Sequence, residues 1–271
     1  MEFRTKVDIP RPTFSIGPNI EMLFVGSCFA DSLGKRFQED KFRAKVNPYG
    51  VMYNPVSIMH TVERIMTDDT EFMPETAIFT LGTNHIYRLK ETGEIVDNCR
   101  KRPQKLFNEE ELTIDECVKC LLKAVEILQN RNSNIRIIIT VSPIRYAKYG
   151  FHGSRLSKAT LLLAADMLVK ENPACTYFPA YEIMNDELRD YRFYREDMLH
   201  PSDQAVEYIW QLFSEAYFSD AARCFINEWR PIKDAIGHKP FNAESEEYKA
   251  FWDKTMRKVA DLSEKYPNFA L

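Results

Sequence analysis

The chain has 271 residues, which suits one large domain or one domain with an extension. It is 45% hydrophobic and 13% aromatic, so it can bury a sizeable core, and its formal net charge is -4 with acidic and basic residues interspersed. The sequence has no basic stripe, no apolar run of membrane-spanning length and no apolar leader, which argues against nucleic-acid binding, a membrane span and a signal peptide. We therefore expect a cytoplasmic protein whose six cysteines are free thiols.

The first third of the chain predicts short strands that alternate with helices. Residues 22–25 form an apolar run typical of a buried strand, and residues 30–39 have the spacing of a helix that packs on a sheet. Asn47-Pro48-Tyr49-Gly50 has the composition of a turn. The elements expected around this turn are a strand over 43–46, a helix over 56–66, a strand over 77–81 and a hairpin from 86–89 and 94–96.

The same alternation continues further along the chain. Residues 135–141 are the most strand-like segment and end at Ser142-Pro143. The sequence also predicts helices over 109–129, 154–171 and 203–218, and a strand over 176–178. Strands that alternate with helices are typical of an α/β protein with a parallel sheet that helices cover on both faces.

The last segment differs in composition. It is rich in charge, its aromatic anchors are Trp229, Trp252 and Tyr266, and residues 248–265 have helical spacing. We therefore predict a main domain over residues 1–225 and a helical extension over residues 226–271 that packs on it.

The cysteines and histidines do not indicate a metal site. Cys117 and Cys120 form a C-x-x-C pair inside the predicted helix 109–129, with no second pair nearby, which favours two small residues on one helix face over zinc. The five histidines lack metal-ligand spacing, and the sequence has no glycine-rich phosphate loop. We therefore expect neither a metal nor a cofactor.

Two distant segments carry the groups that nucleophilic catalysis needs. Ser27 and Cys28 place a hydroxyl and a thiol side by side where a strand is expected to end and a helix to begin. Asp197 precedes His200 by three residues. A nucleophile needs a base and the base needs an orienting group, so we interpret His200 as the base and Asp197 as its orienting carboxylate.

Several turn segments are expected to meet at one edge of the sheet, where open α/β sheets bind their ligands. The segments are Gly26-Ser27-Cys28, Asn47-Pro48-Tyr49-Gly50, Gly82-Thr83-Asn84 and Ser142-Pro143. The amide of Gly50 and the side chain of Asn84 are candidate oxyanion donors for ester chemistry. A turn glycine and a turn asparagine explain the same two residues equally well.

These segments resemble one known family. Phe24-Val25-Gly26-Ser27-Cys28-Phe29-Ala30 looks like the motif that names the GSCFA family, and the resemblance covers roughly residues 5 to 225. The other matching segments are Asn47-Pro48-Tyr49-Gly50, Leu81-Gly82-Thr83, Asn98-Cys99, residues 140–145, Ser157-Lys158-Ala159, residues 190–194 and residues 197–202.

The GSCFA family is similar to the SGNH (GDSL-type) hydrolases. This resemblance implies a flavodoxin-like, three-layer α/β/α fold with a parallel sheet, and the hydrolysis or transfer of ester-linked acyl groups without a metal or cofactor. Asp197-x-x-His200 matches the SGNH catalytic block, and Gly82-x-Asn84 and Gly50 match the oxyanion positions.

The resemblance leaves the nucleophile open. The SGNH block reads Gly-Asp-Ser-Leu, and an ungapped match places Cys28 at its nucleophilic serine, whereas a shift of one residue makes Ser27 the nucleophile. We favour Cys28 on register and keep Ser27 as the alternative. A thiol at a helix N-terminus beside His200 is expected to have a lowered pKa.

The function implied is an acyl-enzyme reaction on a small acyl ester, with an O-acetylated carbohydrate as the first substrate class to test. His152, in a loop, could contact the substrate, and Arg192 could bind an anionic group, although a solvated histidine and a structural ion pair are commoner. One alternative is a non-catalytic module that binds glycans or acyl ligands. Another, a thiol redox protein, needs a resolving cysteine near Cys28.

Overall fold

A parallel sheet forms the centre of the protein in the computed structural model, which describes residues 3–99 and 102–266. Its strands pair in the order β2-β1-β3-β7-β8, and every pairing is parallel. Counted within this sheet the order is 2-1-3-4-5, which is the flavodoxin-like order, so the predicted fold class is confirmed. The strands are β1 (Glu21–Gly26), β2 (Arg43–Val46), β3 (Thr76–Leu81), β7 (Arg136–Val141) and β8 (Cys175–Tyr177).

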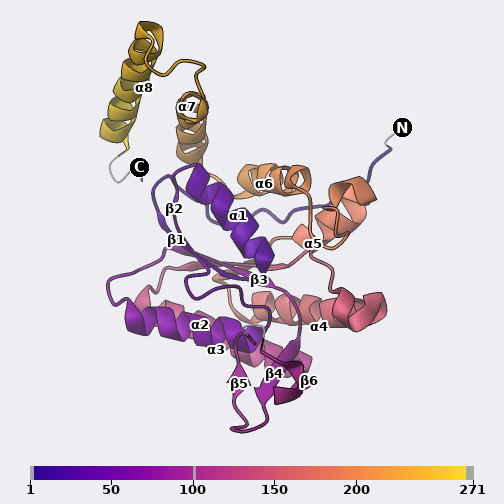
Figure 1. The fold of residues 1–271 in the computed structure, drawn as a ribbon. Helices are drawn as coiled ribbons and strands as arrows, with labels where there is room; N and C mark the ends of the chain where they lie inside the picture. Colours follow the sequence, from indigo (N-terminus) through magenta and orange to yellow (C-terminus); the bar gives the residue numbers. More distant parts are fainter. Residues whose placement is uncertain (1–2, 100–101, 267–271) are drawn as a thin grey trace.

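Helices cover both faces of this sheet (Figure 1). One face carries α1 (Cys28–Glu39) and α6 (Asp203–Tyr217), and the other carries α2 (Pro55–Asp68), α3 (Ile114–Arg131) and α4 (Gly150–Glu171). The alternation of side chains along β1 explains how one strand serves both layers. Met22 and Phe24 belong to the core under α1, whereas Leu23 and Val25 belong to the core under α2 and α3.

A second, antiparallel sheet has the strand order β5-β4-β6. Strands β4 (His85–Leu89) and β5 (Ile95–Val96) confirm the predicted hairpin. The expected start of the following helix is wrong, because residues 107–111 form strand β6 (Phe107–Glu111), which pairs with β4. The helix α3 begins only after Thr113, whose side chain forms a capping box with Glu116.

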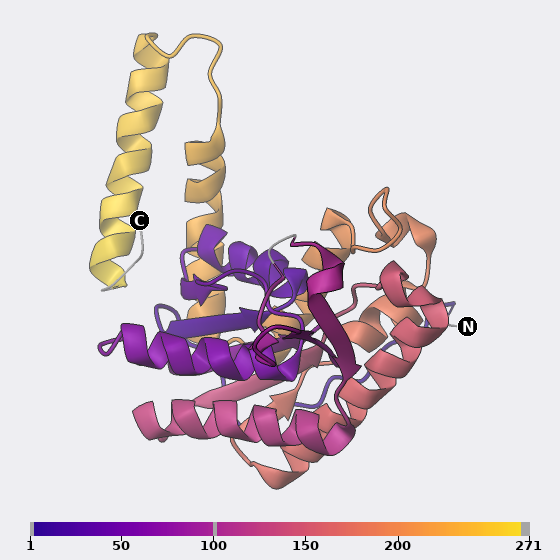
Figure 2. The same cartoon turned by 60° about the horizontal axis from the view of Figure 1, so that its bottom comes forward.

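Two helices follow the sheet domain. Helix α7 (Asp220–Gly237) runs through residues 225 and 226, where we expected a boundary, and buries Trp229, whose indole N–H donates to the carbonyl of Glu39 at 3.0 Å. Helix α8 (Glu246–Lys265) packs beside α7, and the pair projects from the rest of the protein (Figure 2). Within the described residues, none of the helices combines the length and apolar character needed to cross a bilayer.

Short helical turns join the main elements near the carboxyl edge of the sheet. They are η1 (Gln104–Leu106), η2 (Ala147–Tyr149), α5 (Ala180–Glu182), η3 (Ile183–Leu188) and η4 (Tyr191–Phe193). The last of them leads into the segment that carries Asp197 and His200, which precedes α6.

The aromatic core under α1 gives a direct test of this packing. Phe37 is fully buried, and its ring meets that of Trp210 edge to face with centroids 4.5 Å apart. We expect Phe37→Ala to lower the free energy of unfolding by about 3–5 kcal/mol, because it removes buried apolar surface and leaves a cavity. Urea denaturation measures the change, and a loss below about 1 kcal/mol would contradict this packing.

Candidate active site

Ser27 connects β1 to α1 and is fully buried. Its Oγ accepts a hydrogen bond from the N–H of Phe29 at 3.2 Å, so it caps α1, and it lies 3.0 Å from the Oγ1 of Thr80. The N–H of Ser27 also donates to the carbonyl of Thr80 at 3.0 Å. The hydroxyl is therefore part of the joint between strand and helix and has no surface that a substrate could reach.

Cys28 is the first residue of α1 and is only partly buried. Its Sγ lies 3.7 Å from the hydroxyl of Tyr53. Burial raises the pKa of the Cys28 thiol, the hydrogen bond from Tyr53 lowers it, and the carboxylate of Asp31 raises it, with a net rise. The expected lowering of this pKa is therefore wrong, because burial outweighs the hydrogen bonds. Of these two neighbouring residues, Ser27 is fully buried and Cys28 is partly exposed.

Asp197 and His200 form a compact pair before α6. The Oδ2 of Asp197 lies 2.6 Å from the Nδ1 of His200, and its Oδ1 accepts the backbone N–H groups of Leu199 and His200 at 2.8 and 3.0 Å. These backbone hydrogen bonds, followed by the imidazole, lower the pKa of Asp197 to about 2. An ionised Asp197 holds a proton on Nδ1, which leaves the lone pair of Nε2 free to act as a base.

The two segments lie along the same edge of the sheet. The backbone N–H of Arg145, which follows β7, donates to the carbonyl of Leu199 at 3.0 Å. On the other side, Ser32, one turn into α1 from Cys28, lines a cavity together with Arg195 and Asp203. In the part of the chain that the structure describes, no hydrogen bond or ion pair joins His200 to Cys28. Such catalytic hydrogen bonds often tighten only when substrate is bound.

The predicted oxyanion donors have other partners. Gly50 has a φ of +94°, as a turn glycine does, and its N–H donates to the carbonyl of Asn47 at 2.8 Å. Asn84 is buried, and its Nδ2 donates to the carbonyl of Leu112 at 2.8 Å. The N–H of Gly50 is therefore already engaged, whereas the amide of Asn84 has a second N–H that this bond does not use.

The two weaker candidates lie on the surface. His152 is exposed and belongs to the first turn of α4, not to a loop as we expected. Arg192 is exposed and forms an ion pair with Asp190, with Nη2 and Oδ2 3.0 Å apart, which matches the structural use of an arginine. Neither residue has a described contact with Cys28 or His200.

Aromatic side chains that the sequence did not single out line a cavity of about 250 Å³ beside this edge. Tyr53, whose hydroxyl reaches Cys28, is one of them, and the ring of Tyr146 meets it edge to face with centroids 6.1 Å apart. The hydroxyl of Tyr146 is buried against Gly82, where a Cβ would clash with it. No spacing pattern marks these tyrosines, because they come from loops after different strands.

Lys158 links the ends of two strands at the same edge of the sheet. Its Nζ donates to the carbonyls of Gly82 and Ser142 at 2.7 and 2.8 Å, and these residues follow β3 and β7. The side chain is buried, and burial lowers the pKa of Lys158 to about 7. One amine thus fixes the ends of the two neighbouring strands from which Thr83 and Arg145 continue.

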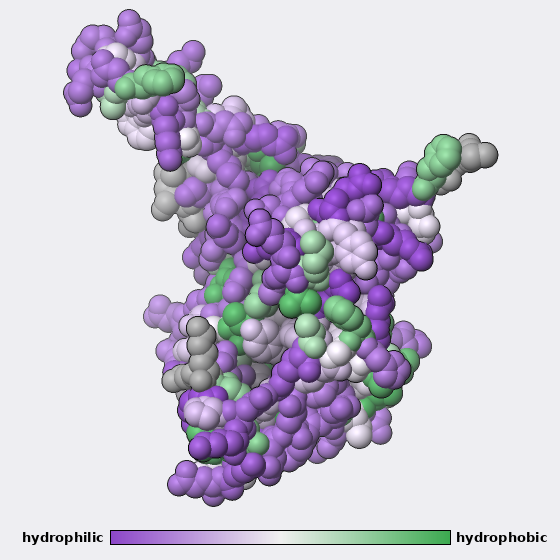
Figure 3. All heavy atoms as spheres, turned by 45° about the vertical axis from the view of Figure 1, so that its right-hand side comes forward, coloured by the Kyte–Doolittle hydropathy of each residue, from purple (hydrophilic) through white to green (hydrophobic). Residues whose placement is uncertain are grey.

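Exposed apolar side chains lie near the His200 segment. Met198 and Phe151 are exposed, and the guanidinium of Arg145 lies over the ring of Phe151 at 4.2 Å. Figure 3 shows apolar residues gathered between two largely hydrophilic regions of one face of the molecule. Such a surface is suited to contact with a partly apolar ligand.

The family of the chain follows from comparison with known proteins. The model of the GSCFA family matches residues 21–75 and 72–213, and that of the GSCFA domain protein C-terminal domain matches residues 229–271.

The chain belongs to the GSCFA family.

Two solved structures illustrate what this GSCFA protein is similar to. A catalytic mutant of Axe2, an acetylxylan esterase from Geobacillus stearothermophilus, has 12% identity and a TM-score of 0.49, with 76% of this chain and 98% of that chain covered. A carbohydrate esterase family 3 structure from Talaromyces cellulolyticus has 8% identity and a TM-score of 0.43, with 72% and 95% covered. Comparison with curated proteins returns no match.

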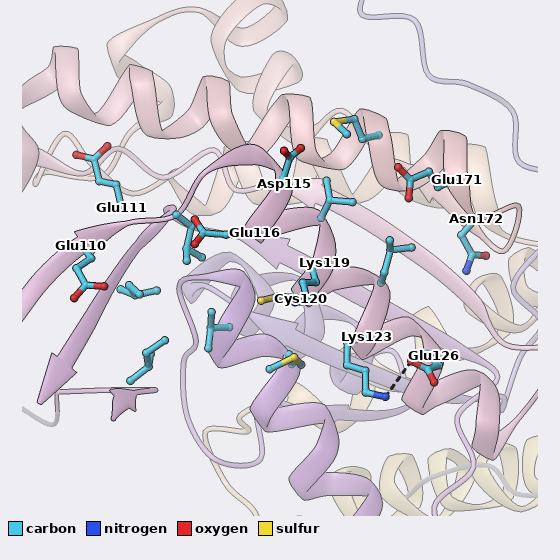
Figure 4. Close-up of a pocket in the computed structure, with 18 of the residues that line it drawn as sticks. Glu110, Glu111, Asp115, Glu116, Lys119, Cys120, Lys123, Glu126, Glu171 and Asn172 are labelled. Carbon is cyan, nitrogen blue, oxygen red and sulfur yellow. Dashed lines mark hydrogen bonds and ion pairs between the residues drawn. The ribbon is translucent and has the colours of Figure 1, made fainter. Parts of the chain in front are cut away.

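A separate cavity of about 980 Å³ lies between α3 and the antiparallel sheet of this GSCFA protein. Acidic side chains outnumber basic ones around it, and Figure 4 shows Glu110 and Glu116 of the first kind and Lys119 and Lys123 of the second. Cys120, the second cysteine of the C-x-x-C pair, lies here, and burial raises the pKa of its thiol. Among the described residues, no group of three or more His, Cys, Asp or Glu is placed to hold a metal ion.

The buried amine of Lys158 makes stability depend on pH. Its pKa is about 7 in the folded protein and near 10.5 when the chain is unfolded, so the unfolded state binds more protons between these values. This group therefore makes the free energy of unfolding rise with pH above about 7. Urea denaturation of the wild type and of Lys158→Met from pH 7 to about 8.5 measures this effect, because the difference between the two pH slopes is the contribution of Lys158 to the free energy of unfolding. Equal slopes in the two proteins would contradict it.

Proposed function

We propose that this GSCFA protein hydrolyses or transfers small acyl esters through an acyl-enzyme formed on Cys28. The observation that carries the proposal is a partly exposed thiol at the N-terminus of α1, on the same sheet edge as an ionised Asp197 paired with His200. Ser27, the alternative nucleophile, is buried and caps the helix. Membership of the GSCFA family and the flavodoxin-like strand order agree with this assignment.

The reaction begins with a neutral thiol, because the pKa of Cys28 is raised. The Nε2 of His200 takes the proton as Sγ attacks the ester carbonyl, and Asp197 stabilises the imidazolium that forms. Collapse of the tetrahedral intermediate breaks the bond to the alcohol, which leaves with the proton from His200. Water or an acceptor alcohol then attacks the thioester while the Nε2 of His200 takes its proton, and the carbon–sulfur bond breaks as His200 returns that proton to Sγ.

This sequence of steps requires the segment of His200 to approach Cys28 when substrate binds. Asp197 orients the imidazole within one tight turn, and the N–H groups of Arg195 and Arg145 hold this turn through the carbonyls of His200 and Leu199. Hydrogen bonds of this kind are often long in unliganded enzymes.

The cavity beside Tyr53 indicates the size of the acyl group. At about 250 Å³, with four tyrosines among otherwise mostly polar lining residues, it suits a small acyl group more than a long chain. O-acetylated carbohydrates are the first substrates to test, on the basis of the similarity between the GSCFA family and SGNH hydrolases.

A second candidate function is a binding module for glycans or acyl ligands that lacks turnover. The raised pKa of Cys28 and the absence of a described contact between Cys28 and His200 favour it. Turnover of a generic ester that depends on Cys28 would exclude this reading.

The first test compares p-nitrophenyl acetate turnover by the wild type, Cys28→Ala, Ser27→Ala and His200→Ala. We expect Cys28→Ala and His200→Ala each to lower kcat about 1000-fold or more, since both act in the same chemical step. Ser27→Ala should keep most of the activity and lose about 1 kcal/mol of stability, because it removes a helix cap. Intact-protein mass spectrometry should find one acetyl group on the wild type and none on Cys28→Ala.

Two results would contradict the proposal. Loss of activity in Ser27→Ala, with activity kept in Cys28→Ala, would make serine the nucleophile. A wild type that binds acetylated glycans, acquires no acetyl group and shows no turnover would support the binding module. Circular dichroism and denaturation curves of each variant separate lost chemistry from lost folding.

A further inference from the structure

The two groups that the sequence predicts as oxyanion donors each donate a hydrogen bond to a backbone carbonyl. The N–H of Gly50 and the Nδ2 of Asn84 donate to the backbone carbonyls of Asn47 and Leu112. An ester reaction on Cys28 still generates a negative oxygen beside Sγ, and donors aimed at it are usually the largest contribution to such catalysis. The donors that matter for this oxygen are those that lie close to Sγ.

Two donors lie next to the thiol. Cys28 is the first residue of α1, so its own N–H has no acceptor within the helix, and this N–H stabilises a negative charge on Sγ. The hydroxyl of Tyr53 lies 3.7 Å from Sγ. Because the oxyanion is bonded to the carbon that Sγ attacks, a donor within reach of Sγ is also placed close to that oxygen.

The backbone around Tyr53 is fixed before any substrate arrives. Its carbonyl accepts the N–H groups of Gly82 and Thr83 at 2.9 and 2.8 Å, which ties it to the end of β3. The next residue, Asn54, caps α2 through a 2.9 Å hydrogen bond from the N–H of Ser57. The main chain that carries the phenol therefore does not need to move during the reaction, and only the hydroxyl of Tyr53 reorients.

Tyr53 is also kept in the form that can donate. Burial raises its pKa, and the hydrogen bond with Cys28 raises it further. The phenol therefore keeps its proton at neutral pH, and it donates without transferring that proton.

We propose that the hydroxyl of Tyr53 stabilises the oxyanion of the tetrahedral intermediate. The inference rests on the proposed function, since it assigns a donor to the same acyl transfer. As Sγ bonds to the carbonyl carbon, the carbonyl electron pair moves to oxygen, and the hydroxyl of Tyr53 turns from Sγ to this oxygen. When the alcohol leaves, the carbonyl re-forms and Tyr53 is unchanged.

Two reactions of the same thiol separate this role from a general effect on Cys28. Acylation by p-nitrophenyl acetate passes through an oxyanion, whereas alkylation by iodoacetamide displaces iodide and forms none. We expect Tyr53→Phe to slow single-turnover acylation of Cys28 about 100-fold, the usual effect of removing one oxyanion donor. Alkylation, compared at equal thiolate fraction from its pH profile, should keep the wild-type rate.

Tyr49→Phe is the matched control. Tyr49 lies in the same loop, and its hydroxyl donates to the carboxylate of Asp68, not to Cys28. This variant should keep wild-type rates in both reactions. Because Tyr53→Phe retains the ring and both backbone hydrogen bonds to Gly82 and Thr83, it should fold, and its denaturation midpoint checks this.

The other outcomes have distinct meanings. Equal slowing of acylation and alkylation in Tyr53→Phe would show that Tyr53 only tunes the thiol, and unchanged rates in both would show no role. Either result overturns the oxyanion assignment while leaving Cys28 as nucleophile. If the wild type is alkylated on Cys28 but never acylated there, the proposed function fails, and the role of Tyr53 fails with it.

Discussion

The hydrogen bonds between Ser27 and Thr80 determine how the rest of this edge is arranged. Both the N–H and the hydroxyl of Ser27 engage Thr80 on the neighbouring strand, so β1 must end there and α1 must start with Cys28. Gly26 permits the close approach, because its φ is +149° and a Cβ would clash with the carbonyl of Thr80. Gly26 thus allows the two strands to approach closely, Ser27 caps α1, and Cys28 places its thiol at the start of the helix.

Most of the fold could be predicted from the sequence, because hydrophobic period and turn chemistry are local signals. The central strands and the hairpin were found to within a few residues. Strand β6 was missed because its charged residues are typical of the exposed face of a helix. The segment is a strand because it pairs with β4, and the ion pair of Arg88 with Glu110 joins the two strands. The start of α4 was placed too late because Gly150 and Gly153 are typical of a loop, so His152 was assigned to that loop.

The candidate site was predictable only in part. Asp197 and His200 are three residues apart, so their contact follows from local geometry, and the register of the first motif indicated Cys28. The contact of Cys28 with Tyr53 has no local signal, because it depends on how the loop after β2 folds over the end of β3. The hydrogen-bond acceptors of Gly50 and Asn84 could not be predicted either, because a motif specifies the residue type and not the acceptor that its N–H group contacts.

The raised pKa of Cys28 has a consequence for the chemical survival of the protein. Oxidation of cysteine by peroxides proceeds through the thiolate, so a protonated and partly buried thiol reacts slowly. An exposed thiol with a strongly lowered pKa would be converted more readily to sulfenic acid. We therefore expect Cys28 to react more slowly with peroxides than an exposed thiol of lowered pKa does.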